Sequence, residues 1–226
     1  ARGLHRARLE AMRTAVILAG GRSRRLGQEK SLLLFDGKPL LCWTVERLST
    51  AADEIVVAAR DEEHALRLEE HLSAFLACGI EPAFTWDRLP GYGPVAGIAA
   101  GMARGKGEFA FAAASDLPFL SPRVVERLFE AAEQHPGCGG AVPVQANGLF
   151  EPLHCVYHRK KMHDACERAM AAGERRISVP LQGIGMRHVA VDLLRGLDRD
   201  LLTFFNLNTG EDLERAGALW AERKEK

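Results

Sequence analysis

An apolar run that ends at two glycines and leads into a basic segment has the residues best suited to chemistry. The run 15–19 is continuous and apolar, and Gly20 and Gly21 follow it directly. Glycines allow positive φ angles and a close backbone approach, so consecutive N–H groups can converge on phosphate oxygens. Arg25 and Lys30 supply countercharge in the segment that follows. These residues predict a loop that binds a triphosphate.

Local composition alone leaves a second interpretation of this loop open. A glycine-rich turn followed by a solvated basic run would have the same residue types. The spacing does exclude two common nucleotide sites, because it matches neither a Walker A loop nor the Gly-x-Gly-x-x-Gly dinucleotide fingerprint. An ordinary ATPase or dehydrogenase is therefore a poor interpretation.

A second candidate is the segment Ser115-Asp116-Leu117-Pro118, which follows the apolar run 109–114. An aspartate just beyond a parallel strand lies at the mouth of a sheet, where its hard oxygens can hold Mg²⁺ against triphosphate oxygens. By itself Asp116 could merely end the strand. Together with the basic loop, it is interpreted as a metal ligand.

Alternating patterns predict the elements that position these residues. Continuous apolar runs predict strands at 15–19, 54–59, 82–86 and 109–114, and helical spacing predicts helices at 40–48, 63–76, 95–102 and 122–134. Parallel strands need crossover connections, so we expect an α/β fold whose mostly parallel sheet has helices on both faces. Functional residues should then gather at the carboxyl ends of the strands.

The pattern changes after residue 135. A strand at 140–144, a turn at Asn147-Gly148 and an apolar run at 149–157 predict an antiparallel excursion. A helix is expected at 160–172, with weaker strands at 189–192 and 203–207. Thr209 and Asp212 form a capping box for a last helix. The predicted fold is a Rossmann-like three-layer sandwich in a single domain at 13–222, preceded by a disordered or non-native extension at 1–12, with Met12 as the natural start.

The charge balance, cysteine pattern and apolar runs limit which partners and compartments are expected. Thirty basic and thirty acidic residues cancel, so no overall field attracts nucleic acid or an anionic membrane. The five cysteines form no Cys-x-x-Cys pair, and their odd number argues against a complete disulfide framework. No apolar stretch approaches the ~20 residues that span a bilayer. We expect a cytoplasmic protein without nucleic-acid or membrane partners.

The basic loop also carries a resemblance. Residues 18–30 fit the pattern Leu-Ala-Gly-Gly-x-Ser-x-Arg-x-Gly-x-x-Lys, and in this they resemble the sugar-nucleotide-type nucleotidyltransferases. The resemblance implies that the nucleotide contacts Leu18, Ala19, Gly20, Gly21, Ser23 and Lys30. It assigns catalytic roles to Arg25, Lys30 and Asp116, and makes Asp116 the magnesium ligand.

Three further segments are similar to the molybdenum cofactor guanylyltransferases, or MobA-type enzymes. Gly93-Pro94-Val95-Ala96-Gly97, preceded by Asp87, would close around the nucleotide. Gly-Glu-Arg-Arg at 173–176 and Asn-x-Asn-Thr at 206–209 would lie on the pterin side and bind the acceptor through Arg175, Arg176, Asn206 and Asn208.

That resemblance implies a reaction and its partners. GMP would pass from GTP to the terminal phosphate of molybdopterin or Mo-molybdopterin, with Mg²⁺ as cofactor and release of pyrophosphate. Molybdenum cofactor insertion proteins would be the protein partners.

Two departures from the family pattern bear on specificity. Members often have a base-contacting asparagine after the second strand, whereas this chain has Ala58 in the segment 56–60, and Gly210 replaces a proline. Guanine selectivity would then depend on backbone contacts after Leu18 and on Asp87, whose carboxylate can accept from purine N1 and N2.

Three alternatives follow. A cytidylyltransferase acting on the same pterin and a sugar- or polyol-phosphate nucleotidyltransferase keep the reaction but change a substrate. A non-catalytic nucleotide-binding module keeps only the scaffold, and the presence of Lys30 and Asp116 speaks against it.

A transition-metal site at His154, Cys155 and His158 is disfavoured. In a strand the two histidines would lie about 13 Å apart, at ~3.3 Å per residue.

Overall fold

The computed structural model describes residues 12–20, 29–76, 79–87, 92–135 and 137–224. In this part of the chain a seven-stranded sheet has the order β5-β4-β1-β6-β8-β7-β9. Its strands are β1 (Arg13–Leu18), β4 (Glu54–Ala59), β5 (Ala83–Trp86), β6 (Phe109–Ala114), β7 (Gly140–Val144), β8 (His154–His158) and β9 (Arg187–Ala190).

One strand reverses the direction of an otherwise parallel sheet. β1 pairs in parallel with β4 and β6, and β9 pairs in parallel with β7. β8 is antiparallel to both neighbours, with Phe109 opposite His158 and Gly140 opposite Tyr157. The predicted mostly parallel sheet with an antiparallel excursion is confirmed.

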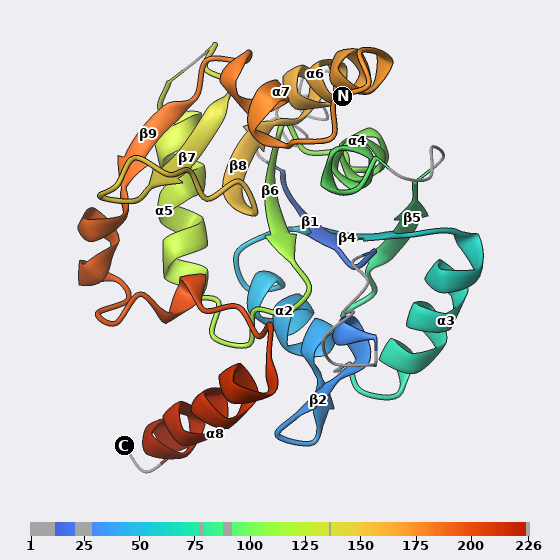
Figure 1. Ribbon diagram of the computed structural model, residues 1–226, viewed down its shortest axis with the longest axis vertical. Coiled ribbons are helices and arrows are strands. Elements are labelled where there is room, and N and C mark those ends of the chain that lie inside the picture. Colours follow the sequence, from blue (N-terminus) through green and yellow to red (C-terminus); the bar gives the residue numbers. More distant parts are fainter. Residues whose placement is uncertain (1–11, 21–28, 77–78, 88–91, 136, 225–226) are drawn as a thin grey trace, which may run out of the picture.

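Helices cover both faces of the sheet and complete three layers (Figure 1). One face carries α2 (Leu40–Leu48), α3 (Glu62–Ser73) and α5 (Pro122–Glu133), and the other carries α4 (Pro94–Arg104), α6 (Arg159–Ala171) and α7 (Ser178–Gln182). β1 contributes side chains to the cores on both faces, because Ile17 packs toward the first face and Val16 toward the second. Strand side chains alternate between faces, and the continuous apolar run at 15–17 reflects burial on both sides.

Close packing of α4 on β1 leaves no room for a side chain at Gly101. A Cβ there would lie 2.2 Å from Cγ1 of Val16. We expect Gly101→Ala to lower the free energy of unfolding by about 1–2 kcal/mol, since overpacking outweighs the better helix propensity of alanine. Chemical denaturation measures the change. Gly217→Ala, in the open on α8 (Gly210–Lys224), is the control and should stabilise by up to ~1 kcal/mol. Equal effects at the two glycines would contradict this prediction.

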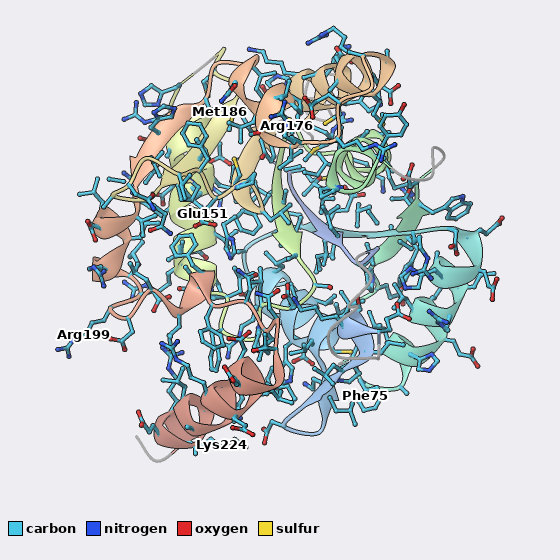
Figure 2. All side chains as sticks on the ribbon, in the orientation of Figure 1. Phe75, Glu151, Arg176, Met186, Arg199 and Lys224 are labelled. Carbon is cyan, nitrogen blue, oxygen red and sulfur yellow. The ribbon has the colours of Figure 1, made fainter. Side chains whose placement is uncertain are left out.

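A small hairpin and the last helix form a separate aromatic cluster. β2 (Leu34–Phe35) and β3 (Lys38–Pro39) flank a turn in which Asp36 and Gly37 have φ angles of 48° and 77°. The Phe35 and Trp220 rings lie 5.5 Å apart, and Asp36 accepts hydrogen bonds from Trp220 and Lys224. α8 therefore packs against the hairpin, at the corner of the molecule where Figure 2 labels Lys224. Asp-Gly is a strong hairpin signal, so this turn is encoded locally in the sequence.

The strand predicted at 203–207 is wrong. This segment begins in the 3₁₀ helix η3 (Leu202–Phe204), after Leu201 at φ 53°. The Thr203 N–H donates to the Asp198 carboxylate at 2.7 Å, so it does not enter a sheet ladder. The strand predicted at 189–192 is shifted, because β9 ends at Ala190 and the 3₁₀ helix η2 (Val191–Gly196) follows.

None of the helices in the described ranges is both long and apolar enough to cross a bilayer.

Candidate active site

The carboxyl ends of β1, β4 and β6 meet at one edge of the sheet, because the three strands are parallel neighbours. The N–H of Ala19 donates to the Ala58 carbonyl at 2.9 Å. At Gly20 the chain passes the backbone of Arg60 so closely that a Cβ would lie 3.4 Å from its Cα. The start of the predicted nucleotide loop is therefore fixed against β4. Gly21, Ser23 and Arg25 lie outside the described residues.

Lys30 contacts two other predicted site residues. It lies at the start of the 3₁₀ helix η1 (Lys30–Leu32). Its ammonium forms an ion pair with Asp116 Oδ2 and donates to Asn208 Oδ1 at 2.8 Å. The Asp116 side chain is 5% exposed and that of Lys30 is 19% exposed. One cation thus connects the end of β6 to the segment before α8.

The electrostatics of Asp116 favour a cationic partner. Burial raises the pKa of its carboxyl group, and the charge and hydrogen bond of Lys30 act in the opposite direction. Asp212 adds a further repulsion. A buried carboxylate in this position gains from any cation that replaces or joins Lys30.

The donor set at this edge suits Mg²⁺ only together with a phosphate ligand. Across the described ranges no group of three or more His, Cys, Asp or Glu side chains could hold a metal. Mg²⁺ in nucleotide sites is bound by one or two carboxylates, with phosphate oxygens and water completing the shell. A single buried Asp116 at the edge of the sheet where the nucleotide loop is predicted fits that chemistry.

Ser31 is a further candidate site residue, which no sequence motif predicts. It is buried, its hydroxyl donates to the Ala19 carbonyl at 3.3 Å, and its Oγ lies 3.0 Å from Ser115 Oγ. The hydroxyl ties the backbone beside Lys30 to the ends of β1 and β6. The only signal in the sequence is its place directly after Lys30.

The segment before α8 holds Asn208 toward Lys30. Asp212 Oδ2 accepts from the N–H groups of Asn208 and Thr209 at 2.9 and 2.8 Å, and Thr209 Oγ1 accepts from Asp212 N at 3.1 Å. The predicted capping box is confirmed. The Asn206 amide donates to the Phe204 carbonyl at 3.3 Å, so its side chain stabilises the loop before the helix.

Arg175 and Arg176 lie in a turn organised by Glu174. The Glu174 carboxylate accepts from both backbone N–H groups at 2.8 Å and from the Arg176 guanidinium, which lowers its pKa to about 2. The Arg175 guanidinium lies 5.7 Å from the centre of the Tyr92 ring. Figure 2 shows Arg176 near α6 and α7. The turn therefore lies against the segment that leads into α4.

Asp87 and Gly93 are the remaining residues predicted on the nucleotide side. The Asp87 N–H approaches the Ala59 carbonyl at 3.4 Å, which places Asp87 beside the end of β4. Gly93 has φ 58° and ψ −135°, a conformation that side chains disfavour, and Pro94 then begins α4. The structure thus places Asp87 at the sheet edge predicted for the nucleotide.

His154 lies in a strand, as predicted, and its ring makes a structural hydrogen bond. It is fully buried, and its Nε2 donates to the Thr203 carbonyl at 2.7 Å. Burial lowers its pKa from 6.5 to about 4. The hydrogen bond joins β8 to η3, which leads toward Asn206 and Asn208.

The protein should become less stable at low pH because His154 is buried as a neutral ring. The unfolded chain takes up a proton near pH 6.5, whereas the folded protein does so only near pH 4. The free energy of unfolding should therefore fall as the pH is lowered through this window, by roughly 3 kcal/mol from this residue. Denaturant titrations at several pH values measure the slope. His154→Gln can still donate to Thr203 but does not titrate, so an unchanged slope in this variant would contradict the prediction.

Fold and site together define an α/β nucleotidyltransferase. The family profile described as the MobA-like NTP transferase domain matches residues 15–189. The chain belongs to the MobA-like NTP transferase family.

Individual relatives agree with this assignment. A "probable molybdenum cofactor guanylyltransferase" of Methanosarcina mazei is 39% identical over 90% of this chain and 89% of the relative. A protein of the same name from Natronomonas pharaonis is 37% identical over 90% of this chain and 96% of the relative. The crystal structure of molybdopterin-guanine dinucleotide biosynthesis protein A from Archaeoglobus fulgidus superposes with a TM-score of 0.78. It is 34% identical and covers 92% of this chain and 99% of its own.

Proposed function

We propose that this protein transfers GMP from GTP to the terminal phosphate of molybdopterin or Mo-molybdopterin and releases pyrophosphate. The observation that carries the proposal is the Lys30 ammonium, which contacts both Asp116 and Asn208. Lys30 and Asp116 belong to the proposed nucleotide side and Asn208 to the proposed acceptor side, so the two substrates would meet at this point. The names of the relatives from Methanosarcina and Archaeoglobus support the choice of substrates.

The reaction needs alignment and charge neutralisation more than a strong base, because the attacking phosphate is already anionic. Lys30 and Arg25 would neutralise the triphosphate, and the backbone of Leu18, Ala19, Gly20 and Gly21, with Ser23, would hold its oxygens. Asp116 would hold Mg²⁺, which would supply further positive charge to the triphosphate.

Other residues would orient the two substrates. Asp87 and Gly93 would enclose the nucleotide, and the Asp87 carboxylate can accept from N1 and N2 of guanine. Arg175, Arg176, Asn206 and Asn208 would bind the acceptor. Ala58 is buried, so its side chain cannot replace the amide that many family members use at this position.

Incubation with labelled GTP or CTP, molybdopterin and Mg²⁺ tests the proposal. We expect label from the α-phosphate of GTP to appear in a pterin dinucleotide, and omission of Mg²⁺ to stop the transfer. Preferential transfer from CTP would instead identify a cytidylyltransferase. Transfer only to a sugar phosphate would reject the pterin, and tight nucleotide binding without any transfer would reject the enzyme.

We place the reaction in the cytoplasm within one domain at 13–222, with the product passed to molybdenum cofactor insertion proteins. Cys42, Cys138, Cys155 and Cys166 are free thiols, which suit a reducing compartment.

A further inference from the structure

The residue before Lys30 makes contacts that the proposed reaction does not use. Glu29 is the N-terminal flanking residue of η1, and its side chain is 18% exposed. One carboxylate oxygen contacts His64 Nε2 and the other contacts the Arg67 guanidinium. Both partners belong to α3, so Glu29 connects the chain beside Lys30 to a helix on one face of the sheet.

The hydrogen bonds define which way the His64 ring is oriented. Its Nδ1 accepts from the backbone N–H of Arg60 at 3.1 Å. A backbone N–H can only donate, so Nδ1 carries no proton and the neutral ring must hold its proton on Nε2. Nε2 therefore donates to Glu29. Burial also lowers the pKa of His64, in keeping with a neutral ring.

His64 is itself rigidly held. Its side chain is 1% exposed. Its backbone N–H donates to Asp61 Oδ1 at 2.8 Å, which caps the start of α3. A fixed ring at the end of β4 thus provides a fixed partner for Glu29.

Lys30 is consequently held from both sides. Glu29 fastens it to α3, and Ser31 fastens it to the carboxyl ends of β1 and β6. A lysine side chain has four flexible carbons and loses much rotamer entropy when it binds a phosphate. A fixed backbone reduces how far the ammonium can stray from the site, and such preorganisation favours ligand binding.

We propose that Glu29, oriented by His64, is a positioning residue. It fixes the backbone of Lys30 so that the ammonium group is in place to bind the nucleotide. The assignment rests on the proposed nucleotide site but not on the identity of the acceptor. Neither side chain need touch substrate, since both act through the backbone of Lys30.

Two substitutions at position 64 separate positioning from a general structural role. In His64→Asn the amide oxygen reaches the place of Nδ1, so the bond from Arg60 is kept and that to Glu29 is lost. In His64→Gln the amide nitrogen reaches the place of Nε2, so the bond to Glu29 is kept and that from Arg60 is lost. His71→Ala, in the last turn of the same helix, is the matched control.

The readouts are the Kd of GTP with Mg²⁺, by calorimetry, and the thermal unfolding midpoint. We expect His64→Asn to weaken GTP binding about tenfold, as for the loss of one hydrogen bond to a charged group. His64→Gln should bind GTP within about twofold of wild type even if it unfolds at a lower temperature. Affinities that simply follow stability across the variants, or a His71→Ala protein as weak as His64→Asn, would overturn the proposal.

A double-mutant cycle with Lys30 tests the route of the effect. If His64 acts through Lys30, His64→Asn should weaken GTP binding little further in a Lys30→Met protein. A full tenfold loss in that background would overturn the proposal. GTP binding is measured without an acceptor, so a wild-type protein that binds GTP but transfers nothing would reject the proposed reaction and leave this test intact.

Discussion

Asp116→Asn should reduce GMP transfer by at least ~10³-fold, because it removes the carboxylate proposed to hold Mg²⁺ at the α-phosphate. The side chain keeps its size and one oxygen, so packing at the end of β6 is preserved. The pKa of Asp116 is raised by burial, which means that its ionised form costs folding free energy at neutral pH. The free energy of unfolding of the asparagine variant should therefore lie within about 1 kcal/mol of the wild-type value. Single-turnover assays with labelled GTP, together with denaturation curves, measure both quantities.

A matched control is Asp192→Asn, whose carboxylate is 69% exposed and pairs with Arg195 in the same turn. It should transfer GMP at the wild-type rate. Transfer by Asp116→Asn within tenfold of wild type in the presence of Mg²⁺ would show that the metal is held elsewhere. Loss of transfer through unfolding would appear in the denaturation curves.

The sequence was a good guide wherever one local pattern decided the structure. The bounds predicted for 40–48, 54–59 and 109–114 coincide with α2, β4 and β6. These segments have continuous burial or clear helical spacing. The segment 203–207 begins with a β-branched and two aromatic residues, which favours a strand. Instead the Asp198 carboxylate accepts from the Thr203 N–H, and a 3₁₀ turn results.

The candidate site shows the same division. Lys30 and Asp116 could be brought together from sequence, because the ends of parallel neighbouring strands share an edge. The side chains that hold Lys30 could not. Glu29 contacts His64 on α3, and the Ser31 hydroxyl contacts that of Ser115 beyond β6. Nothing local in the sequence marks such pairs, since their partners are set by how the helices and strands pack.

Lys30→Gln should reduce GMP transfer by about 10²–10³-fold and weaken GTP binding, because one charge beside the triphosphate is lost. Lys38→Gln is the control, since Lys38 pairs with Glu46 of α2 at 2.7 Å. It should leave transfer unchanged. Steady-state assays separate kcat from KM, and transfer by Lys30→Gln close to that of Lys38→Gln would remove Lys30 from the proposed mechanism.

The contacts of Lys30 also predict an effect on the order of binding. The Lys30 ammonium contacts both Asp116 and the Asn208 amide oxygen. A triphosphate bound at the proposed site would attract the Lys30 ammonium, which would release Asn208 for the acceptor and leave Asp116 free to hold Mg²⁺. Molybdopterin should therefore bind several-fold more tightly when a non-hydrolysable GTP analogue is present, and by linkage the analogue should bind more tightly with molybdopterin. In Lys30→Gln this coupling should largely disappear, because a neutral amide is not drawn from Asn208 by phosphate. Equal coupling in wild type and variant, measured by calorimetry, would mean that the two substrate sides communicate by another route.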